Sequence, residues 1–192
     1  MTVGAILLAA GSARRMRADK LLAQLDGKPM ILHTFDAIVA AGLDAPIVAI
    51  APGSAVRELV DGRAEIVEVA NHASGMGHSL SASIAQAPPH WTAAIICLGD
   101  MPFVRPETLA ALAAAGHIDS VVRPRFAGRP GNPVLWGRAY FSELGRLTGD
   151  QGGREMLDRY AVKWLDCDDR AVLFDIDTPD ALAEARRFLE RP

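Results

Sequence analysis

Apolar and polar positions along the chain follow two periods that succeed one another repeatedly. Short apolar runs, typical of buried strands, are separated by stretches in which apolar residues recur every three or four positions, as in helices that cover a sheet. Strands are predicted at Val3–Ala9, Ala45–Ala51, Glu65–Val69, Ala93–Leu98 and Ser120–Arg123. Helices are predicted at Pro29–Gly42, Ser54–Val60, His78–Gln86, Pro106–Ala115, Ala139–Leu144, Gly152–Tyr160 and Pro179–Glu190.

The succession of strands and helices predicts βαβ units, and hence a sheet whose strands are mainly parallel. Because no linker-like stretch or block of charge divides the chain, we expect residues 1–192 to form one domain. The expected fold is therefore α/β, a single Rossmann-like domain of three layers. Residues Arg125–Trp136 depart from this pattern, since turn residues lie between two apolar ends. They predict a small hairpin or ordered loop rather than a helix.

Composition narrows the classes of partner. Half of the 192 residues are hydrophobic and 22% are charged, which is typical of a globular protein and not of a disordered one. The net charge of -3 argues against a surface for a long nucleic acid, because such binding depends on neutralising many phosphates. No apolar stretch is long enough to cross a membrane, and two cysteines are too few for a disulfide framework. We therefore expect a cytoplasmic protein that binds neither nucleic acid nor membrane.

The first predicted strand runs into a loop of small residues, Leu8-Ala9-Ala10-Gly11, which is followed by the cations Arg15 and Lys20. Small side chains let backbone N–H groups approach a polyphosphate, and nearby cations neutralise its charge. The loop therefore indicates a phosphate site, although it matches neither a Walker motif nor a dinucleotide fingerprint. A polar turn with solvated basic residues is the alternative interpretation.

Carboxylates follow a second predicted strand and recur near the end of the chain. Asp100 comes directly after Ala93–Leu98 and Gly99, at the sheet edge where open α/β folds bind ligands, and its carboxylate suits Mg²⁺. Asp175 and Asp177 lie on one side of the chain if it is extended there. Either could be a second metal ligand, whereas Asp177 could instead cap the last helix.

A glycine-containing segment, Asn71–Ser79, joins the third predicted strand to a helix. Its glycines permit a close approach of the backbone, and Asn71 and Ser79 offer hydrogen bonds suited to a base or ribose. A strand-to-helix turn with no ligand has the same composition, so the local pattern leaves both interpretations open.

Taken together and in this order, these residues resemble the nucleotidyltransferases that build dinucleotide forms of the molybdenum cofactor, and within them the molybdenum cofactor cytidylyltransferases. The guanylyltransferase relatives read Leu-Ala-Gly-Gly where this chain has Ala10 before Gly11, which favours cytidine. The chain departs from the family at Ala13, Arg17 and Asn132, where Ser, Gly and His are usual. The resemblance rests on Leu8–Gly11 with Arg15, Met16 and Lys20; Asn71 with Gly75, Met76 and Ser79; Gly99–Pro102; Gly128–Gly131; Gly149, Asp150, Gly153 and Arg154; and Asp175–Pro179.

The resemblance implies a role for each matching residue. Arg15, Lys20 and Asp100 would be catalytic, and Asp100 with Asp177 would hold Mg²⁺. The nucleotide would be bound by Leu8, Ala9, Ala10, Gly11, Arg15, Lys20, Asn71, Gly75, Met76 and Ser79. The acceptor would lie against Asn132, Asp150 and Arg154, on the side of the hairpin insertion.

The implied reaction transfers CMP from CTP to the terminal phosphate of molybdenum-molybdopterin and releases pyrophosphate. The product would pass to a molybdoenzyme or its chaperone. A phosphate nucleophile is already anionic at neutral pH, so no general base is required. Three alternatives remain: a molybdenum cofactor guanylyltransferase, a nucleotidyltransferase with another small phosphate acceptor, and a non-catalytic carrier of the cofactor. A pyridine-nucleotide oxidoreductase is disfavoured because no dinucleotide fingerprint is present.

Overall fold

The computed structural model describes residues 1–11, 20–149, 156–178, 180, 181, 183 and 185. The strands of its main sheet are β1 (Val3–Ala9), β4 (Ile47–Ile50), β5 (Glu65–Glu68), β6 (Ala93–Leu98), β7 (Val121–Phe126), β8 (Arg129–Pro130), β9 (Val134–Gly137) and β10 (Val162–Asp166). A separate hairpin contains β2 (Gln24–Leu25) and β3 (Lys28–Pro29). The α-helices are α1 (Met30–Ala40), α2 (Val56–Val60), α3 (Met76–Ile84), α4 (Pro106–Ala115) and α5 (Phe141–Leu144), and the 3₁₀ helices are η1 (Lys20–Leu22), η2 (His72–Ser74), η3 (Arg138–Tyr140) and η4 (Arg170–Leu173).

The main sheet has the strand order β10-β7-β9-β6-β1-β4-β5, and β8 pairs with β7 in a hairpin. Strand β1 is parallel to both of its neighbours, β4 pairs in parallel with β5, and β10 with β7. Strand β9 is antiparallel to β6 and β7. The prediction of an α/β fold with a mainly parallel sheet and a small hairpin insertion is therefore confirmed.

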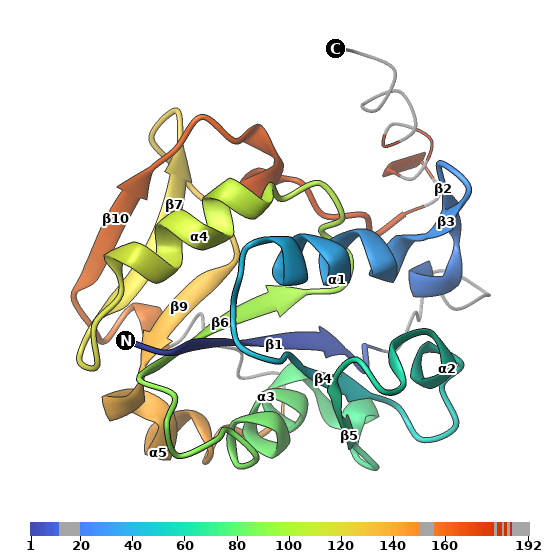
Figure 1. Ribbon diagram of the computed structural model, residues 1–192, viewed down its shortest axis with the longest axis horizontal. Helices are drawn as coiled ribbons and strands as arrows, with labels where there is room; N and C mark the ends of the chain where they lie inside the picture. The colour runs from blue at the N-terminus through green and yellow to red at the C-terminus, as the bar shows by residue number, and fades with distance from the viewer. Residues whose placement is uncertain (12–19, 150–155, 179, 182, 184, 186–192) are drawn as a thin grey trace.

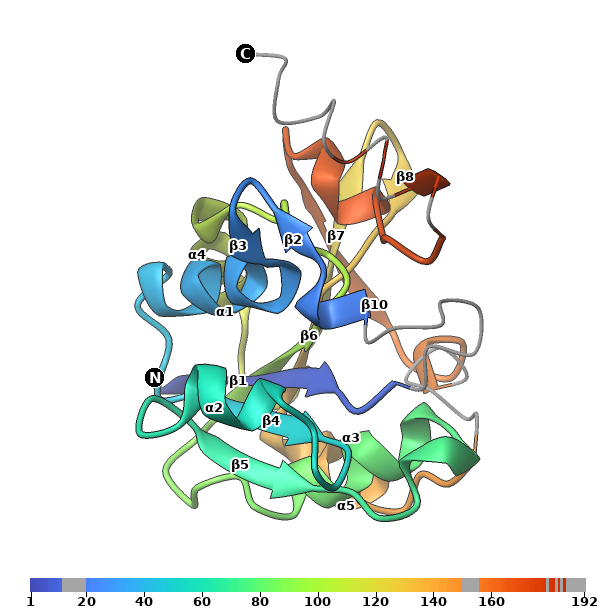
Figure 2. The same ribbon diagram turned by 90° about the vertical axis from the view of Figure 1, so that its right-hand side faces the viewer.

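Alternation along β1 divides the core into two layers. Ala5, Leu7 and Ala9 pack into one apolar cluster with residues of α1 and α4, whereas Ile6 and Leu8 pack into another with residues of α3 and α5. Successive side chains of a strand point to opposite faces, so a fully apolar strand requires helices on both faces. Figures 1 and 2 accordingly show α1 and α4 on one side of the sheet and α3 and α5 on the other.

Three predicted elements, Val3–Ala9, Ala93–Leu98 and Pro106–Ala115, have the bounds of β1, β6 and α4. The segment predicted as a hairpin or loop is only partly so, because its last residues form the buried strand β9. A short apolar run that begins after a proline has no period to distinguish it, and its place between two strands decides its structure. The predicted helices Gly152–Tyr160 and Pro179–Glu190 lie partly outside the described residues. Residues 156, 157, 180, 181, 183 and 185, which do belong to the described part, are helical.

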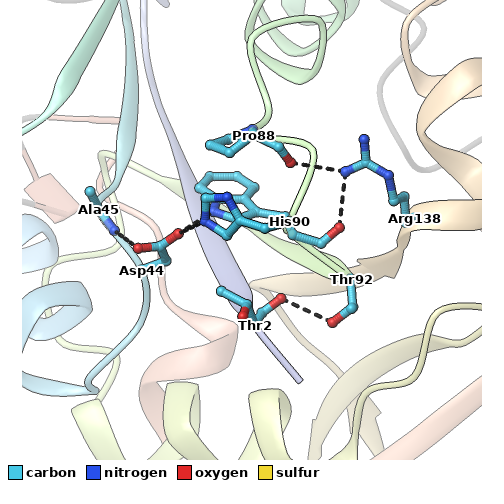
Figure 3. A network of polar contacts seen from close by, with 8 residues as sticks. Thr2, Asp44, Ala45, Pro88, His90, Thr92 and Arg138 are labelled. Carbon is cyan, nitrogen blue, oxygen red and sulfur yellow. Dashed lines mark hydrogen bonds and ion pairs between the residues drawn. The ribbon is translucent and has the colours of Figure 1, made fainter.

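A network of polar contacts closes the amino edge of the sheet, at the start of β4 and β6 (Figure 3). The carboxylate Oδ2 of Asp44 accepts hydrogen bonds from Nε1 of Trp91 and Nε2 of His90, each at 2.6 Å. The Trp91 indole is fully buried and lies against Gly4, where an added Cβ would come within 2.0 Å of the ring. Gly4 therefore lets the indole pack directly on β1.

Backbone carbonyls in the same network are bonded by two further side chains. Arg138 donates from Nη1 to the carbonyls of Pro88 and Trp91, at 3.0 and 2.9 Å, and Thr92 donates from its hydroxyl to the carbonyl of Thr2 at 2.9 Å (Figure 3). The carbonyls of Thr2 and Pro88 also accept a backbone N–H, from Thr92 and Trp91, so the side chains fill their second acceptor positions.

We expect Asp44→Asn to lower the free energy of unfolding at neutral pH by about 1–2 kcal/mol, because hydrogen bonds to a charged acceptor exceed those to an amide. The hydrogen bonds from His90 and Trp91 lower the pKa of Asp44 below its ordinary value. A carboxyl whose pKa is lowered on folding stabilises the protein above its unfolded pKa, near 3.9, and loses that contribution as the pH falls through the folded pKa.

Urea unfolding of wild type and Asp44→Asn between pH 7 and pH 3 tests this. The difference between the two proteins should shrink below about pH 4. Asp61→Asn, at an exposed position, is the control and should show no such difference. A pH-independent difference for Asp44→Asn would contradict the electrostatic origin.

Candidate functional site

Strands β1, β4, β5 and β6 are parallel, so their carboxyl ends share one edge of the sheet. In Figure 1 the arrowheads of β1 and β6 point toward the side that holds the β2–β3 hairpin, and the red C-terminal segment passes across the same side. Ligands of open α/β sheets bind at this edge. Three segments remote in sequence place charged side chains there.

Lys20 is the first residue of η1, and the next residue, Leu21, is 4% exposed and packs into the core. The chain then enters the β2–β3 hairpin, whose turn residues Asp26 and Gly27 have φ of 52° and 73°. A two-residue turn with positive φ at both positions suits the right-handed twist of a hairpin. The buried leucine and the tight hairpin together fix the backbone that carries the Lys20 ammonium.

Asp100 is placed by the glycine that precedes it. The N–H of Gly99 donates to the carbonyl of Leu8 at 3.1 Å, which ties the end of β6 to the end of β1. A Cβ at Gly99 would lie 2.8 Å from Cδ1 of Ile31 and 3.2 Å from the Leu8 carbonyl oxygen. The close approach therefore depends on glycine and sets Asp100 next to the end of β1.

Asp177 reaches the same place through the segment that follows η4. The N–H of Ile176 donates to the carbonyl of Asp100 at 2.9 Å, and the Ile176 side chain is fully buried. Its two neighbours in the chain are Asp175 and Asp177. Thr178 accepts the N–H of Ala181 at 3.1 Å, the type of hydrogen bond that an N-cap residue makes.

Lys20 joins the two acids. Its Nζ lies 2.8 Å from Oδ2 of Asp100 and 2.7 Å from Oδ1 of Asp177. Burial by itself lowers the pKa of Lys20, but the attraction of the two carboxylates outweighs burial and the pKa is raised. The pKa of Asp175 is raised by burial, by its hydrogen bond with Asp177 and by the charges of Asp177 and Asp100. The cluster holds negative charge that a single lysine only partly neutralises.

Asp100 also offers a free oxygen. Its Oδ1 is buried and has no hydrogen-bond partner within the part of the chain that the structure describes. A buried carboxylate oxygen without a partner is costly unless a cation or a donor meets it. Among the described residues no group of three His, Cys, Asp or Glu side chains is arranged to hold a metal. Two carboxylates nevertheless fit Mg²⁺, which takes one or two from a protein and fills its shell with water and phosphate oxygens.

The other side of the edge is organised by two histidines for which the sequence showed no functional pattern. Nδ1 of His72 donates to the carbonyl of Ala10 at 2.8 Å, which fixes the chain after β1. Nε2 of His78 accepts the N–H of Gly149 at 3.2 Å, so its proton is on Nδ1, which lies 3.0 Å from the Asn71 amide. The donor on Nδ1 requires the amide oxygen of Asn71 to face it. The N–H of Gly77 returns to the Gly149 carbonyl at 3.0 Å.

The predicted nucleotide segment Asn71–Ser79 forms η2 and the start of α3. Gly75 has φ 127°, a conformation open to glycine, and links the two helices. Asn71 and Met76 are exposed, whereas Ser79 is only 4% exposed and lies on the buried face of α3. Asn71 and Met76 are therefore placed to meet a ligand, and Ser79 contributes to packing.

The remaining predicted residues fall into two groups. Asn132 precedes the reversed strand β9, whose first residue pairs with Ile96 near the carboxyl end of β6, so it lies at the edge that carries Asp100. Its N–H donates to the Val172 carbonyl at 2.8 Å. Arg15, Asp150 and Arg154 lie outside the described residues.

None of the helices within the described part of the chain has the length and apolarity needed to cross a membrane.

The lysine and the two carboxylates thus lie at the edge where open α/β sheets bind ligands. Comparison with known proteins identifies the class. The chain belongs to the family of the MobA-like NTP transferase domain, whose model matches residues 5–164. It is therefore a member of a nucleotidyltransferase family.

Individual relatives agree with this assignment. The chain is 30% identical over 196 residues to the bifunctional protein GlmU of Heliobacterium modesticaldum, which covers 96% of this chain but 42% of that protein. The chain thus spans less than half the length of this curated relative.

Two solved structures extend the comparison. Rv0371c of Mycobacterium tuberculosis H37Rv superposes with a TM-score of 0.86 at 27% identity, covering 97% of this chain and 98% of that one, and it has also been crystallised in complex with manganese. Molybdopterin-guanine dinucleotide biosynthesis protein A of Archaeoglobus fulgidus, at 21% identity, shares the fold with a TM-score of 0.74, covering 98% of this chain and all of that one.

We expect His78→Leu to increase the hydrogen-exchange rate of the Gly149 amide about two- to tenfold, the factor that corresponds to the loss of one hydrogen bond. His78→Gln, which keeps an acceptor near the position of Nε2, should retain most of the protection. Exchange of assigned amides measured by NMR tests this, with His90→Leu at the opposite edge as the control. Equal Gly149 protection in wild type and His78→Leu would show that the imidazole does not hold this loop.

Proposed function

We propose that this chain transfers CMP from CTP to the terminal phosphate of molybdenum-loaded molybdopterin and releases pyrophosphate. Membership of the MobA-like NTP transferase family supports nucleotidyl transfer, and the order of the motifs supports a molybdopterin acceptor. The observation that carries the proposal is the meeting of Lys20, Asp100 and Asp177 at the carboxyl edge, next to the end of β1.

In this proposal the phosphates lie at the end of β1. Leu8 is paired on both sides, with β4 and β6, so its backbone is committed to the sheet. Ala10 and Gly11 are the first residues after the strand, and Gly11 is exposed, with no described residue within 4 Å of an added Cβ. Lys20, and Arg15 from the adjoining loop, would supply positive charge to the triphosphate.

Asp100 and Asp177 are the residues that would hold a divalent cation, and the unpartnered Oδ1 of Asp100 is suited to it. When bound, Mg²⁺ neutralises charge on the α-phosphate and on the departing pyrophosphate. The manganese complex of Rv0371c supports a divalent cation in a protein of this fold. The protein's own task is to bring two anions into line, because the attacking phosphate oxygen needs no general base.

The acceptor would approach from the side of β9. Asn132 lies at the carboxyl edge, and Gly149 leads from its contacts with Gly77 and His78 toward residues 150–154. We propose that Asn132, Asp150 and Arg154 contact the acceptor. Asn71, Gly75, Met76 and Ser79 would form the base and ribose side, with Asn71 and Met76 making contact and Gly75 and Ser79 shaping the turn.

The choice of base rests on Ala10, which is 2% exposed and packs in the cluster with Leu8. Because its methyl group fills space in the core, glycine at this position would loosen the start of the nucleotide loop. The name of the Archaeoglobus neighbour makes GTP the competing donor to test.

We expect Lys20→Ala and Asp100→Asn each to lower Mg²⁺-dependent transfer by roughly 10²–10³-fold, the usual cost of removing one preorganised electrostatic contact. Pyrophosphate release from CTP in the presence of molybdenum-molybdopterin provides the measurement. Circular dichroism would confirm that both variants fold. Lys28→Ala is the matched control, since Lys28 pairs with Asp36 away from this cluster. Near-normal turnover of Lys20→Ala or Asp100→Asn would overturn the assignment.

Donor selectivity provides a second test. We expect wild type to prefer CTP over GTP, and Ala10→Gly to shift the ratio of kcat/KM for the two donors toward GTP. Initial rates with each donor at fixed Mg²⁺ and molybdopterin give this ratio. A wild-type preference for GTP would favour a guanylyltransferase. Turnover with another small phosphate and none with molybdopterin would favour a different acceptor.

A further inference from the structure

We infer that Lys20 is an internal counter-ion that occupies the place between Asp100 and Asp177 until a divalent cation displaces it. Metal binding then releases the ammonium for the triphosphate. This inference rests on the proposed function of the site. It adds an order of events, in which the divalent cation binds first and Lys20 then becomes available to the triphosphate.

The geometry supports a shared position. The Lys20 ammonium contacts one oxygen of each acid, at 2.8 Å and 2.7 Å, and so bridges them. The lysine side chain is 16% exposed, so solvent screens these contacts only in part. A cation that chelates both acids through the same oxygens must enter the gap that the ammonium fills.

Electrostatic repulsion opposes the presence of both Mg²⁺ and the Lys20 ammonium between Asp100 and Asp177. Mg²⁺ binds carboxylate oxygens at about 2.0–2.1 Å and demands near-ideal octahedral geometry. An ammonium in contact with the same oxygens would lie against the ion, and the repulsion between like charges is strong where the site is partly buried. Asp100 Oδ1, which has no partner among the described residues, offers the cation a first contact, but chelation by Asp177 requires Lys20 to move.

The lysine also explains how the acids are held together without a metal. Asp100 and Asp177 bring two carboxylates to the same ammonium. A positive charge between Asp100 and Asp177 offsets their repulsion. The same contacts keep Lys20 away from any phosphate until the cation arrives, which couples metal binding to phosphate binding.

Mn²⁺ binding in the absence of nucleotide tests the inference. We expect Lys20→Met to bind Mn²⁺ about tenfold more tightly than wild type, the factor for removing a competing state that holds the site about nine-tenths of the time. The concentration of free Mn²⁺ is measured by electron paramagnetic resonance. Lys28→Met is the control and should bind as wild type does.

Variants of the two acids distinguish a failure of the proposed metal site from a failure of the proposed displacement of Lys20. Asp100→Asn and Asp177→Asn should each weaken Mn²⁺ binding. If neither does, the proposed metal site is wrong and the inference is lost with it. If both do, but Lys20→Met binds no more tightly than wild type, the metal site stands and the displacement of Lys20 is overturned.

A second experiment uses the wild-type protein, so it does not depend on the folding of a variant. The chain has three lysines, Lys20, Lys28 and Lys163, so acetylation at each can be followed by mass spectrometry of peptides. MgCl₂ without nucleotide should increase acetylation of Lys20 and leave Lys28 and Lys163 unchanged. Unchanged or reduced acetylation of Lys20 on adding MgCl₂ would overturn the inference.

Discussion

The ion pairs of Lys20 with Asp100 and Asp177 join segments that are 80 and 157 residues apart in the chain. The side chains of Lys20 and Asp100 are only 16% and 20% exposed, and a buried charge needs an opposite charge beside it, so these two depend on each other. Asp177, at 54% exposure, adds a second contact from the solvent side. The acidic segment after η4 docks on the carbonyl of Asp100 through Ile176, and η1 docks through Leu21. The proposed site is therefore the point at which segments around residues 20, 100 and 177 meet at the carboxyl edge of the sheet.

The two edges of the sheet differ in how their polar groups are hydrogen-bonded. The amino edge is closed by Asp44, Trp91 and Arg138, whose hydrogen bonds satisfy the loops before β4 and β6. At the carboxyl edge, by contrast, one oxygen of Asp100 has no hydrogen-bond partner among the described residues. Hydrogen bonds therefore stabilise the edge where we expect no ligand. The unpaired oxygen of Asp100 lies at the other edge, where the parallel strands end.

Long apolar runs and well-marked helix starts made much of the fold predictable. Strands β1 and β6 are continuous apolar segments, and α4 begins at a proline in its first position, so local pattern and final structure agree. Strand β9 has four residues and β10 is largely exposed, so neither has a period long enough to reveal it. Their pairing is decided by tertiary contacts between β6, β7 and the strands themselves.

The residues of the site were predictable in type but not in their mutual contacts. Motif order drew attention to Lys20, Asp100 and Asp177, yet a lysine that binds two acids and a lysine that binds phosphate look the same in a sequence. Thr178 accepts a capping hydrogen bond from Ala181 and Asp177 contacts Lys20, and only geometry could reveal these two contacts. His72 and His78 carry no spacing signal because each bonds a backbone group far away in the chain.

The reversal of β9 has a consequence for how such a protein can diversify. In a strand parallel to its neighbours, the loop after the strand reaches the carboxyl edge. In β9 it is the connection before the strand, through the β7–β8 hairpin and Asn132, that arrives there. That hairpin can change in length and composition while β1, β6 and the charged cluster keep their positions. Selection can therefore alter what is accepted by the proposed enzyme in a part of the chain separate from the part that handles the nucleotide.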